Sequence, residues 1–498
     1  MSEWRFQRDR IAAFRFVRCS LDPDSGVAQL VYAFDDGPEL TEVVTVPGAP
    51  FRLEGARAVA VERALQWLHL VAGVSYYKAA VPQQIRIEGY GIDVETAALL
   101  ESVYVDGLGE FAYRNGLQLR GRVKFPVAGV PSSGPSGHLL PQAGEGTGAG
   151  VPPVPQVGEG TGSVVVPPLP LAGEGRGEGA PALGLRAHAL VAIGGGKDSL
   201  VSVEALRSAQ VEQTATWIGG SQLIAACVER TGLPSLNPGR ALASELFEFN
   251  RQGAWNGHIP VTAVNSAILV LVALLHDANQ VVFSNERSAS YGSLIPGTGE
   301  VNHQWSKGWA FERAFGEYVE QRIAADLRYY SLLRPLSELA VARQFATNDR
   351  YDACFSSCNR NFHILGERPA TRWCGMCPKC HFVFLALAPF MSKLRLVGIF
   401  GRNLLDDPAQ AAGYDALLEY RDHKPFECVG EGRESRAAMA LLGERAEWRE
   451  DALVARFNRE IRPQLDPADL AMAPLLTPSG EHRIPAALWE KLHADFAA

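Results

Sequence analysis

A strand-like run, three glycines and a helix-like run follow one another in ALVAIGGGKDSLVSVEAL at 189–206, and this stretch constrains the fold more than any other. Glycines allow a tight turn and bring several backbone N–H groups close to one point. The N-terminus of the following helix adds a positive dipole end, which favours phosphate as the ligand. The stretch therefore predicts a βα unit of a parallel sheet with a phosphate site at its turn. The residues expected to contact phosphate are Gly194, Gly195, Gly196, Lys197, Asp198 and Ser199.

The spacing of this loop separates it from the commoner phosphate loops. A Walker A loop has its hydroxyl residue directly after the lysine, but here Asp198 stands between Lys197 and Ser199. A dinucleotide fingerprint would need a third glycine at position 199. GGGKDS instead resembles the PP-loop of the ATP pyrophosphatases, S-G-G-x-D-S, with Gly194 in place of the first serine. The resemblance implies that ATP is cut to AMP and pyrophosphate while a substrate oxygen is adenylated. The alternative is a strand–helix turn without a ligand.

The segments after the loop predict the rest of an α/β fold. Strand-like runs at 214–218 and 280–284 alternate with helical patterns at 199–209, 221–231 and 261–277. This alternation indicates a doubly wound parallel sheet covered by helices on both faces. The PP-loop resemblance implies the adenine nucleotide α-hydrolase-like type. The expected units are an N-terminal α+β domain at 1–126, the ATP-binding domain at 183–400 and a helical region at 401–498.

Between the first two units lies a low-complexity segment, 127–182, which is rich in Gly, Pro, Ser and Val. The unit P-x-x-G-E-G recurs there three times without apolar periodicity. Such a segment cannot bury enough apolar surface to form a core, so we expect a disordered linker that can be deleted without loss of activity. A repeat domain is the alternative.

Charge and hydropathy exclude several classes of protein. The net charge of −8 disfavours a large nucleic-acid interface, which normally shows a surplus of Lys and Arg. The N-terminus has no apolar signal core, and the longest aliphatic run, AILVLVALL at 267–275, is too short to span a membrane. Five of the eight cysteines fall between 354 and 380, which suits a reducing compartment. We therefore expect a cytoplasmic protein with small-molecule ligands and no membrane or nucleic-acid partner.

A second polar loop follows the strand-like run at 280–284. Its residues Asn285, Glu286 and Arg287 stand at the carboxyl end of a predicted parallel strand, which is where α/β sheets bind ligands. The PP-loop resemblance implies that this loop lines the substrate pocket. An ordinary solvated turn is the alternative.

The cysteine cluster predicts a metal site. Two C-x2-C steps and a fourth cysteine upstream supply four thiolates, which suits tetrahedral zinc with a structural role. Cys354 and His381 are alternative ligands, and an iron–sulfur cluster or free thiols are alternative states. The arrangement also resembles the zinc site of 7-cyano-7-deazaguanine synthase, another PP-loop enzyme. The expected ligands are Cys358, Cys374, Cys377 and Cys380.

Seven further stretches are VAQLVYAFDDGPEL (27–40), VAGVSYYKAAVPQQI (71–85), NGHIPVTAVNSA (256–267), SNERSAS (284–290), VNHQWSKG (301–308), RWCGMCPKC (372–380) and HKPFECVGE (423–431). Together they resemble one family, the UDP-N-acetylmuramoyl-L-alanyl-L-glutamate epimerases (MurL), and the resemblance covers nearly the whole chain apart from 127–182. It implies an isomerase of peptidoglycan precursor synthesis that inverts the terminal L-Glu of UDP-MurNAc-L-Ala-L-Glu, consumes ATP with Mg²⁺ and releases AMP and pyrophosphate.

The implied chemistry gives roles to the loop residues. Adenylation removes the negative charge of the α-carboxylate, so that a base can take the Cα proton and a donor can return it on the other face. Gly195, Gly196 and Ser199 would hold the pyrophosphate, while Asp198 would place Mg²⁺ and Lys197 would bind a phosphate. For the proton transfer, the first residue to test is Cys428, and Lys78 is a second candidate.

Two other functions fit parts of the sequence. A PP-loop synthase that modifies a nucleobase or tRNA would use the same loop and zinc site, although the acidic charge disfavours tRNA. A non-catalytic ATP sensor would explain the glycine at the first serine position. The sequence does not predict the oligomeric state.

Overall fold

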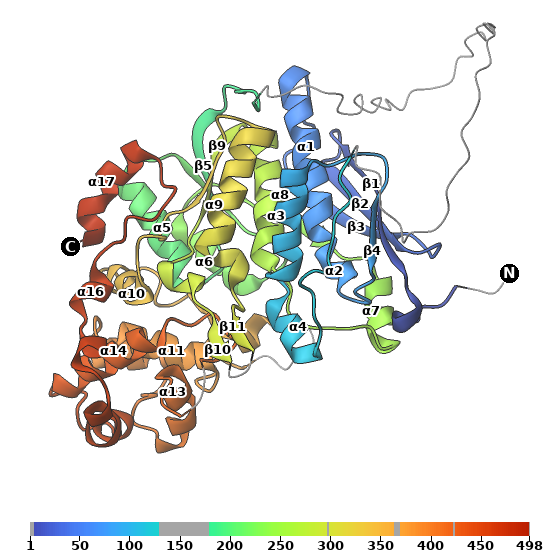
Figure 1. Ribbon diagram of the computed structural model, residues 1–498. Helices are drawn as coiled ribbons and strands as arrows, with labels where there is room; N and C mark the ends of the chain where they lie inside the picture. Colours follow the sequence, from blue (N-terminus) through green and yellow to red (C-terminus); the bar gives the residue numbers. More distant parts are fainter. Residues whose placement is uncertain (1–3, 129–178, 296–297, 363–368, 422–423, 498) are drawn as a thin grey trace, which may run out of the picture.

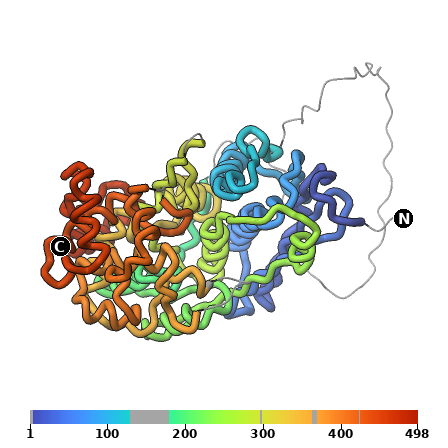
Figure 2. The backbone as a smooth tube through the Cα atoms, turned by 90° about the horizontal axis from the view of Figure 1, so that it is seen from below, coloured from blue at the N-terminus to red at the C-terminus, as the bar shows by residue number. Residues whose placement is uncertain are grey.

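The computed structural model describes residues 4–128, 179–295, 298–362, 369–421 and 424–497. The predicted linker at 127–182 lies outside these ranges except for its two ends. Two five-stranded sheets and the helices around them form an elongated molecule. The N-terminal sheet lies at one end and the C-terminal helices at the other, both in the first view (Figure 1) and from below (Figure 2).

The N-terminal sheet has the order β4-β1-β2-β3-β8. Strands β1 (Ala13–Asp22), β2 (Val27–Phe34) and β3 (Leu40–Thr45) form the predicted antiparallel meander. Strand β4 (Gln84–Ile87) pairs parallel to β1, and β8 (Gly239–Ala241) pairs antiparallel to β3. Residues on both sides of the 127–182 segment therefore build one sheet.

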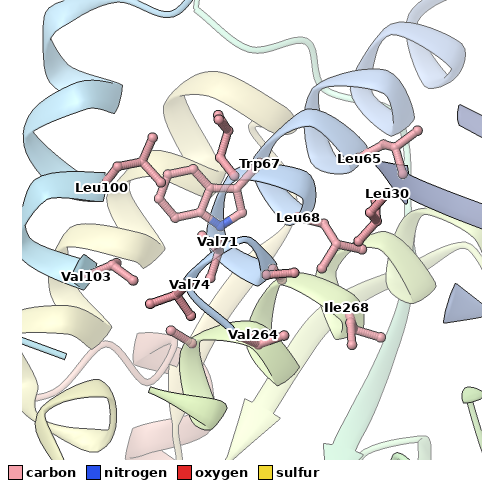
Figure 3. Packing of buried hydrophobic residues seen from close by; sticks show 14 of the residues in the cluster. Leu30, Leu65, Trp67, Leu68, Val71, Val74, Leu100, Val103, Val264 and Ile268 are labelled. Atoms are coloured by element: carbon pink, nitrogen blue, oxygen red, sulfur yellow. The ribbon is translucent and has the colours of Figure 1, made fainter. Parts of the chain in front are cut away.

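A dense apolar core joins this sheet to the rest of the molecule. Helix α1 (Gly55–Ala72) packs along α8 (Val261–Leu275), and α3 (Val94–Val105) lies beside them. Figure 3 shows Trp67 and Leu68 of α1 among side chains of α3 and α8, including Ile268. Helix α8 is buried on nearly all sides by the protein itself. This burial accounts for its long aliphatic run.

The second sheet is wholly parallel, with the order β12-β9-β5-β6-β7. If these five strands are numbered by their order in the chain, with β5 as strand 1 and β12 as strand 5, the order from the β7 edge is 3-2-1-4-5. The direction in which strands are added to the sheet therefore reverses between β5 and β9. The α/β class with a parallel sheet is confirmed. The strands are β5 (Arg186–Ala192), β6 (Gln213–Thr216), β7 (Ser235–Leu236), β9 (Ala278–Phe283) and β12 (Arg328–Ser331).

Two hydrophobic cores lie on the two faces of this sheet. In β5, Leu190 packs into the core shared with α1 and α8, while Ala189 and Val191 pack into the core of the C-terminal half. This alternation is the two-residue period of a strand buried on both faces. The connecting helices include α5 (Lys197–Ser208), α6 (Gln222–Thr231) and α9 (Trp309–Tyr318).

The C-terminal region is mainly helical, as predicted. Short helices also occur earlier in the chain: α2 (Val74–Tyr77), α4 (Gly109–Asn115) and α7 (Glu245–Arg251), and a small hairpin joins β10 (Ser293–Ile295) to β11 (Gly299–Val301). The C-terminal helices are α10 (Glu338–Ala346), α11 (Pro378–Leu387), α12 (Lys393–Phe400), α13 (Ala411–Leu417), α14 (Gly432–Glu444), α15 (Ala452–Arg456), α16 (Ala473–Leu476) and α17 (Ala486–Ala497).

Within the described ranges, no helix combines the length and the apolar character that crossing a lipid bilayer would require.

Candidate functional site

The glycine loop connects β5 to α5 at the carboxyl edge of the parallel sheet. Gly195 has a φ of +80°, a conformation that side chains with a Cβ rarely adopt. A Cβ on Gly196 would lie 2.6 Å from Ser357 Oγ, and Ser356 N donates to Gly195 O at 2.9 Å. The loop is thus held closely against segment 356–357. Around Gly194, in contrast, a Cβ would meet open space.

Lys197 points into the protein interior and not out of the loop. Its side chain is 1% exposed and forms ion pairs with Asp198 and with Glu338, the first residue of α10. Burial opposes the charge on the ammonium, but the two carboxylates outweigh burial and raise its pKa above the ordinary value. Lys197 therefore stays protonated and orients both carboxylates.

Three carboxylates meet beside the loop. Asp198, Glu286 and Glu338 each bring an oxygen within 4.8 Å of the other two. Burial, together with the charges of Glu338 and Asp198, raises the pKa of Glu286 to about 8. Glu338 is also buried, but Lys197 and Lys379 outweigh burial and lower its pKa to about 2. Oxygen ligands at this spacing fit a divalent cation such as Mg²⁺, which would relieve the repulsion that raises the pKa of Glu286.

The three residues predicted to line the pocket after β9 have different environments. Glu286 joins the carboxylates at the glycine loop, while Asn285 Nδ2 donates to Ser331 Oγ at 3.0 Å at the end of β12. Arg287 reaches towards the C-terminal segment, where its guanidinium donates to the carbonyls of Leu475 and Thr477. Of these three side chains, only that of Glu286 lies next to the glycine loop.

A second polar cluster surrounds Cys428. Lys307 Nζ lies 3.2 Å from Cys428 Sγ, His303 interacts with the thiol, and Lys379 donates to the Cys428 carbonyl. Burial opposes ionisation of the thiol, but Lys307, His303 and Lys379 outweigh it and lower the pKa of Cys428 to about 5. A thiol in this environment is a thiolate at neutral pH.

His303 is held by residues from two other parts of the chain. Its Nδ1 hydrogen-bonds to Glu110 of α4, and its ring lies 4.1 Å from the ring of His258, measured between centroids. Burial lowers the pKa of an imidazole, but Cys428 and Glu110 outweigh burial and raise that of His303 to about 9. Nearby, Lys78 Nζ donates to Asn256 at 2.8 Å, and burial lowers its pKa to about 8.

Two buried cations join the carboxylate cluster to the Cys428 cluster. Lys379 Nζ lies 3.6 Å from Glu338 Oε1 and also contacts the Cys428 carbonyl. Arg334, paired with Glu312 at 2.8 Å, donates to the carbonyls of Glu286 and Lys307. The glycine loop and Cys428 therefore belong to one continuous polar site at the edge of the sheet.

The four predicted metal ligands come together. Cys374 Sγ lies 3.7 Å from Cys380 Sγ, which lies 3.5 Å from Cys377 Sγ, and Cys358 completes a group whose sulfurs are all within 4.8 Å. The two alternative ligands are engaged elsewhere: Cys354 interacts with Cys227, and His381 Nε2 with Gln410.

A cleft of about 530 Å³ opens near the glycine loop, where a Cβ on Gly195 would lie 3.3 Å from Ile224 of α6. It is lined by Gly220, Ser221, Gln222, Leu223, Asn361, Pro369, Ala370, Thr371 and Arg372. The start of α6 thus faces a space next to the predicted phosphate site.

Several residues of the site could not be given a role from the sequence. His303 and Lys307 lie in VNHQWSKG and His258 in NGHIPVTAVNSA, two stretches that carried the family resemblance. Glu338 and Glu110 stand in ordinary helical patterns that gave no signal.

Comparison with known proteins gives the same family over the whole chain. The MurL N-terminal domain model matches residues 5–166 and 171–332, and the MurL C-terminal domain model matches 354–472. A UDP-N-acetyl-alpha-D-muramoyl-L-alanyl-L-glutamate epimerase of Xanthomonas oryzae pv. oryzae is 69% identical, with 99% of each chain covered. Epimerases of the same name from Micromonospora sp. (40%; 96% of this chain and 97% of the relative) and Salinispora tropica (39%; 95% and 94%) are also similar. The chain therefore belongs to the MurL family.

Proposed function

We propose that this chain is an ATP-dependent epimerase that inverts the terminal L-Glu of UDP-MurNAc-L-Ala-L-Glu to D-Glu for peptidoglycan precursor synthesis in the cytoplasm. Its relatives carry the name of this epimerase. The observation that carries the ATP-dependent mechanism is the continuity of the site. Lys379 links the carboxylates at the glycine loop to the backbone carbonyl of Cys428. Activation of a carboxylate and proton transfer at the neighbouring carbon can therefore take place in one continuous polar site.

The role of ATP follows from the acidity of the substrate. A free α-carboxylate makes removal of the Cα proton very unfavourable, because the resulting carbanion would lie beside a negative charge. An acyl-adenylate has lost that charge and delocalises the carbanion onto its carbonyl oxygen. Hydrolysis of the inverted adenylate then releases the product and AMP.

The glycine loop would bind the phosphates, in a fold of the PP-loop type. The strand order 3-2-1-4-5 places it at the switch point of the sheet, where α/β folds bind nucleotides. Backbone N–H groups of Gly195 and Gly196 and the hydroxyl of Ser199 would hold the pyrophosphate, with the nucleoside in the cleft at the start of α6. Lys197 would act by orienting Asp198 and Glu338.

Asp198, Glu286 and Glu338 would hold Mg²⁺, which would neutralise charge on the phosphates. Next to them, the Cys428 thiolate would exchange a proton with the α-carbon. Lys307 keeps the sulfur ionised and positions it.

The four cysteines would hold a structural zinc ion. A tetrahedron with Zn–S bonds of about 2.3 Å has edges of about 3.8 Å, close to the two measured sulfur–sulfur distances of 3.5 and 3.7 Å. The ion would also fix Lys379, which lies between two of the ligands in the chain. Elemental analysis should find about one zinc ion per chain, and much less in Cys374→Ser.

The direct test is incubation of the purified chain with ATP, Mg²⁺ and the L-Glu dipeptide substrate. We expect AMP, pyrophosphate and D-Glu, the last detected by chiral analysis after acid hydrolysis. AMP formed only with a deazapurine base and ammonia, or ATP bound without turnover, would contradict the proposal.

A further inference from the structure

Inversion of a carbon centre requires two proton transfers, one on each face. If the proposed function holds, Cys428 supplies a group for one face, and a second group must face the same carbon. Among the described residues, the charged side chains that act on the Cys428 sulfur are Lys307, His303 and Lys379, and Lys379 is held by the Cys428 carbonyl and Glu338. Lys307 already donates to the sulfur from 3.2 Å, and its charge is what keeps the thiolate ionised.

His303 has the geometry of a positioned acid–base residue. Its Nδ1 is bonded to the buried carboxylate of Glu110, so its Nε2 is the ring nitrogen left to exchange a proton. The ring is half-buried against His258 and approaches Cys428 from the segment after β11, whereas Cys428 lies in the segment before α14. Two side chains from separate segments therefore converge on one point.

We propose that His303 is the second catalytic acid–base residue and that it acts with Cys428 on opposite faces of the substrate α-carbon. Side-chain rotation of the two groups would admit the α-carbon between the sulfur and Nε2. Glu110 is then a positioning residue, because it fixes the ring and stabilises its positive charge.

The proton balance of this pair closes with solvent water as the only other reactant. The reaction starts from a thiolate and an imidazolium. The base on the side of the Cα–H bond takes the proton, and the electron pair of that bond moves into the enolate. The acid on the other side delivers a proton to the carbon, and the enolate electrons form the new C–H bond. If Cys428 is the base, a thiol and a neutral imidazole result; the thiol then gives its proton to solvent water and the imidazole takes one from it, which restores the starting pair.

The charges in the site support this starting state. Despite burial, the neighbouring cations hold the pKa of Cys428 at about 5, and Cys428 and Glu110 hold that of His303 at about 9. At neutral pH the thiolate and the imidazolium are therefore the main forms of the two groups.

Deuterium exchange in Cys428→Ala and His303→Gln tests the proposal. Each protein receives ATP, Mg²⁺ and the L-Glu substrate in D₂O. Pyrophosphate–ATP exchange reports adenylation, mass spectrometry of the recovered L-substrate reports exchange at Cα, and chiral analysis reports D-Glu. Cys19→Ala and His493→Gln are matched controls in the N-terminal sheet and on the exposed face of α17.

We expect both variants to keep pyrophosphate–ATP exchange and to lose D-Glu formation by at least about 100-fold. One variant should still introduce deuterium into the L-substrate, because only one of the two groups faces the proton of that epimer. Cα exchange by both variants or by neither, or D-Glu formation by His303→Gln at the wild-type rate, would overturn the pair. Absence of pyrophosphate–ATP exchange in the wild-type chain would instead contradict the proposed function, and this inference with it.

Discussion

Two buried regions of this molecule differ in the kind of side chain that they exclude from water. The core between α1 and α8 consists of side chains such as Trp67, Leu68 and Ile268, all excluded from water and in contact with one another. The site at the edge of the parallel sheet is just as buried, but Lys197 and Glu338 there are charged. Apolar burial stabilises a fold directly, whereas buried charges cost desolvation that their pairing only partly offsets.

Under the proposed function, the charged region serves the chemistry and not the stability of the fold. Fixed ions in a dry pocket stabilise developing charge far better than the same ions in water. The two regions should therefore respond differently to substitution. Core changes should lower stability and leave turnover per folded molecule unchanged. Changes in the charged site should remove activity, and they should lower stability only where they leave a buried charge without its partner.

The largest expected effect is on stability, in Lys197→Met. Removing this cation leaves Glu338 and Asp198 without their closest partner and should lower the free energy of unfolding by about 3–5 kcal/mol. The double variant Lys197→Met/Glu338→Leu should recover most of that loss, because it removes the buried charge as well. Urea unfolding measures both proteins, and neither should cleave ATP. A double variant no more stable than the single one would contradict the expectation that the unpaired charge of Glu338 causes most of the loss.

In the apolar core, Leu68→Ala should lower the free energy of unfolding by about 2–5 kcal/mol and Ile268→Val by about 0.5–1.5 kcal/mol. Both side chains are almost fully buried, so truncation loses contacts and leaves a cavity. Epimerisation per folded molecule should not change at a temperature where both variants are folded. A loss of turnover without a loss of stability would show that this core is coupled to the site.

Asp198→Asn should lower substrate-dependent AMP formation at least about 100-fold, equivalent to about 2.7 kcal/mol in the barrier. The amide keeps the shape of the side chain but removes one of three carboxylates beside the glycine loop. The melting temperature should stay close to that of the wild type. Asp24→Asn, in an exposed turn, is the matched control. Wild-type AMP formation by Asp198→Asn would exclude this carboxylate from the chemistry.

The smallest expected effect is the pH dependence of Cα proton exchange. The thiolate of Cys428, facing Lys307 and Lys379, is present above about pH 5, and the imidazolium of His303, facing Glu110 and His258, is present below about pH 9. The rate should therefore be highest between these values and fall about tenfold per pH unit outside them. Pyrophosphate–ATP exchange in the same buffers is the reference. An exchange rate that changes with pH through one ionisation near pH 7 would contradict the roles given to Cys428 and His303.

The parts of the fold that could be predicted from the sequence are those with local patterns. The run at 189–193 is the strand β5, and the helical patterns at 199–209, 221–231 and 261–277 are α5, α6 and α8. The addition of β8 to the N-terminal sheet could not be foreseen. Its three residues, GRA, carry no periodicity, and their partner in β3 is about 200 positions away.

The residues of the site also differ in how far they could be predicted from the sequence. The glycine loop and three of the four clustered cysteines each lie within one short stretch of sequence, so spacing alone indicates their chemistry. Glu110, His303 and Cys428 come from three distant segments, and only tertiary packing brings them together. His303 and Cys428 lie in stretches that carried the family resemblance, but only Cys428 could be given a role from the sequence.

In the proposed function, ATP cleavage at the glycine loop and proton transfer at Cys428 are two steps of one reaction. The most direct test is to count AMP, D-Glu and Cα deuterium in the same reaction in D₂O, with and without ATP. We expect one AMP for each acyl-adenylate that is hydrolysed, whether it releases D-Glu or L-Glu. Each D-Glu should carry one deuterium at Cα, and no Cα exchange should occur when ATP is left out. Inversion or exchange without ATP would contradict the proposed function.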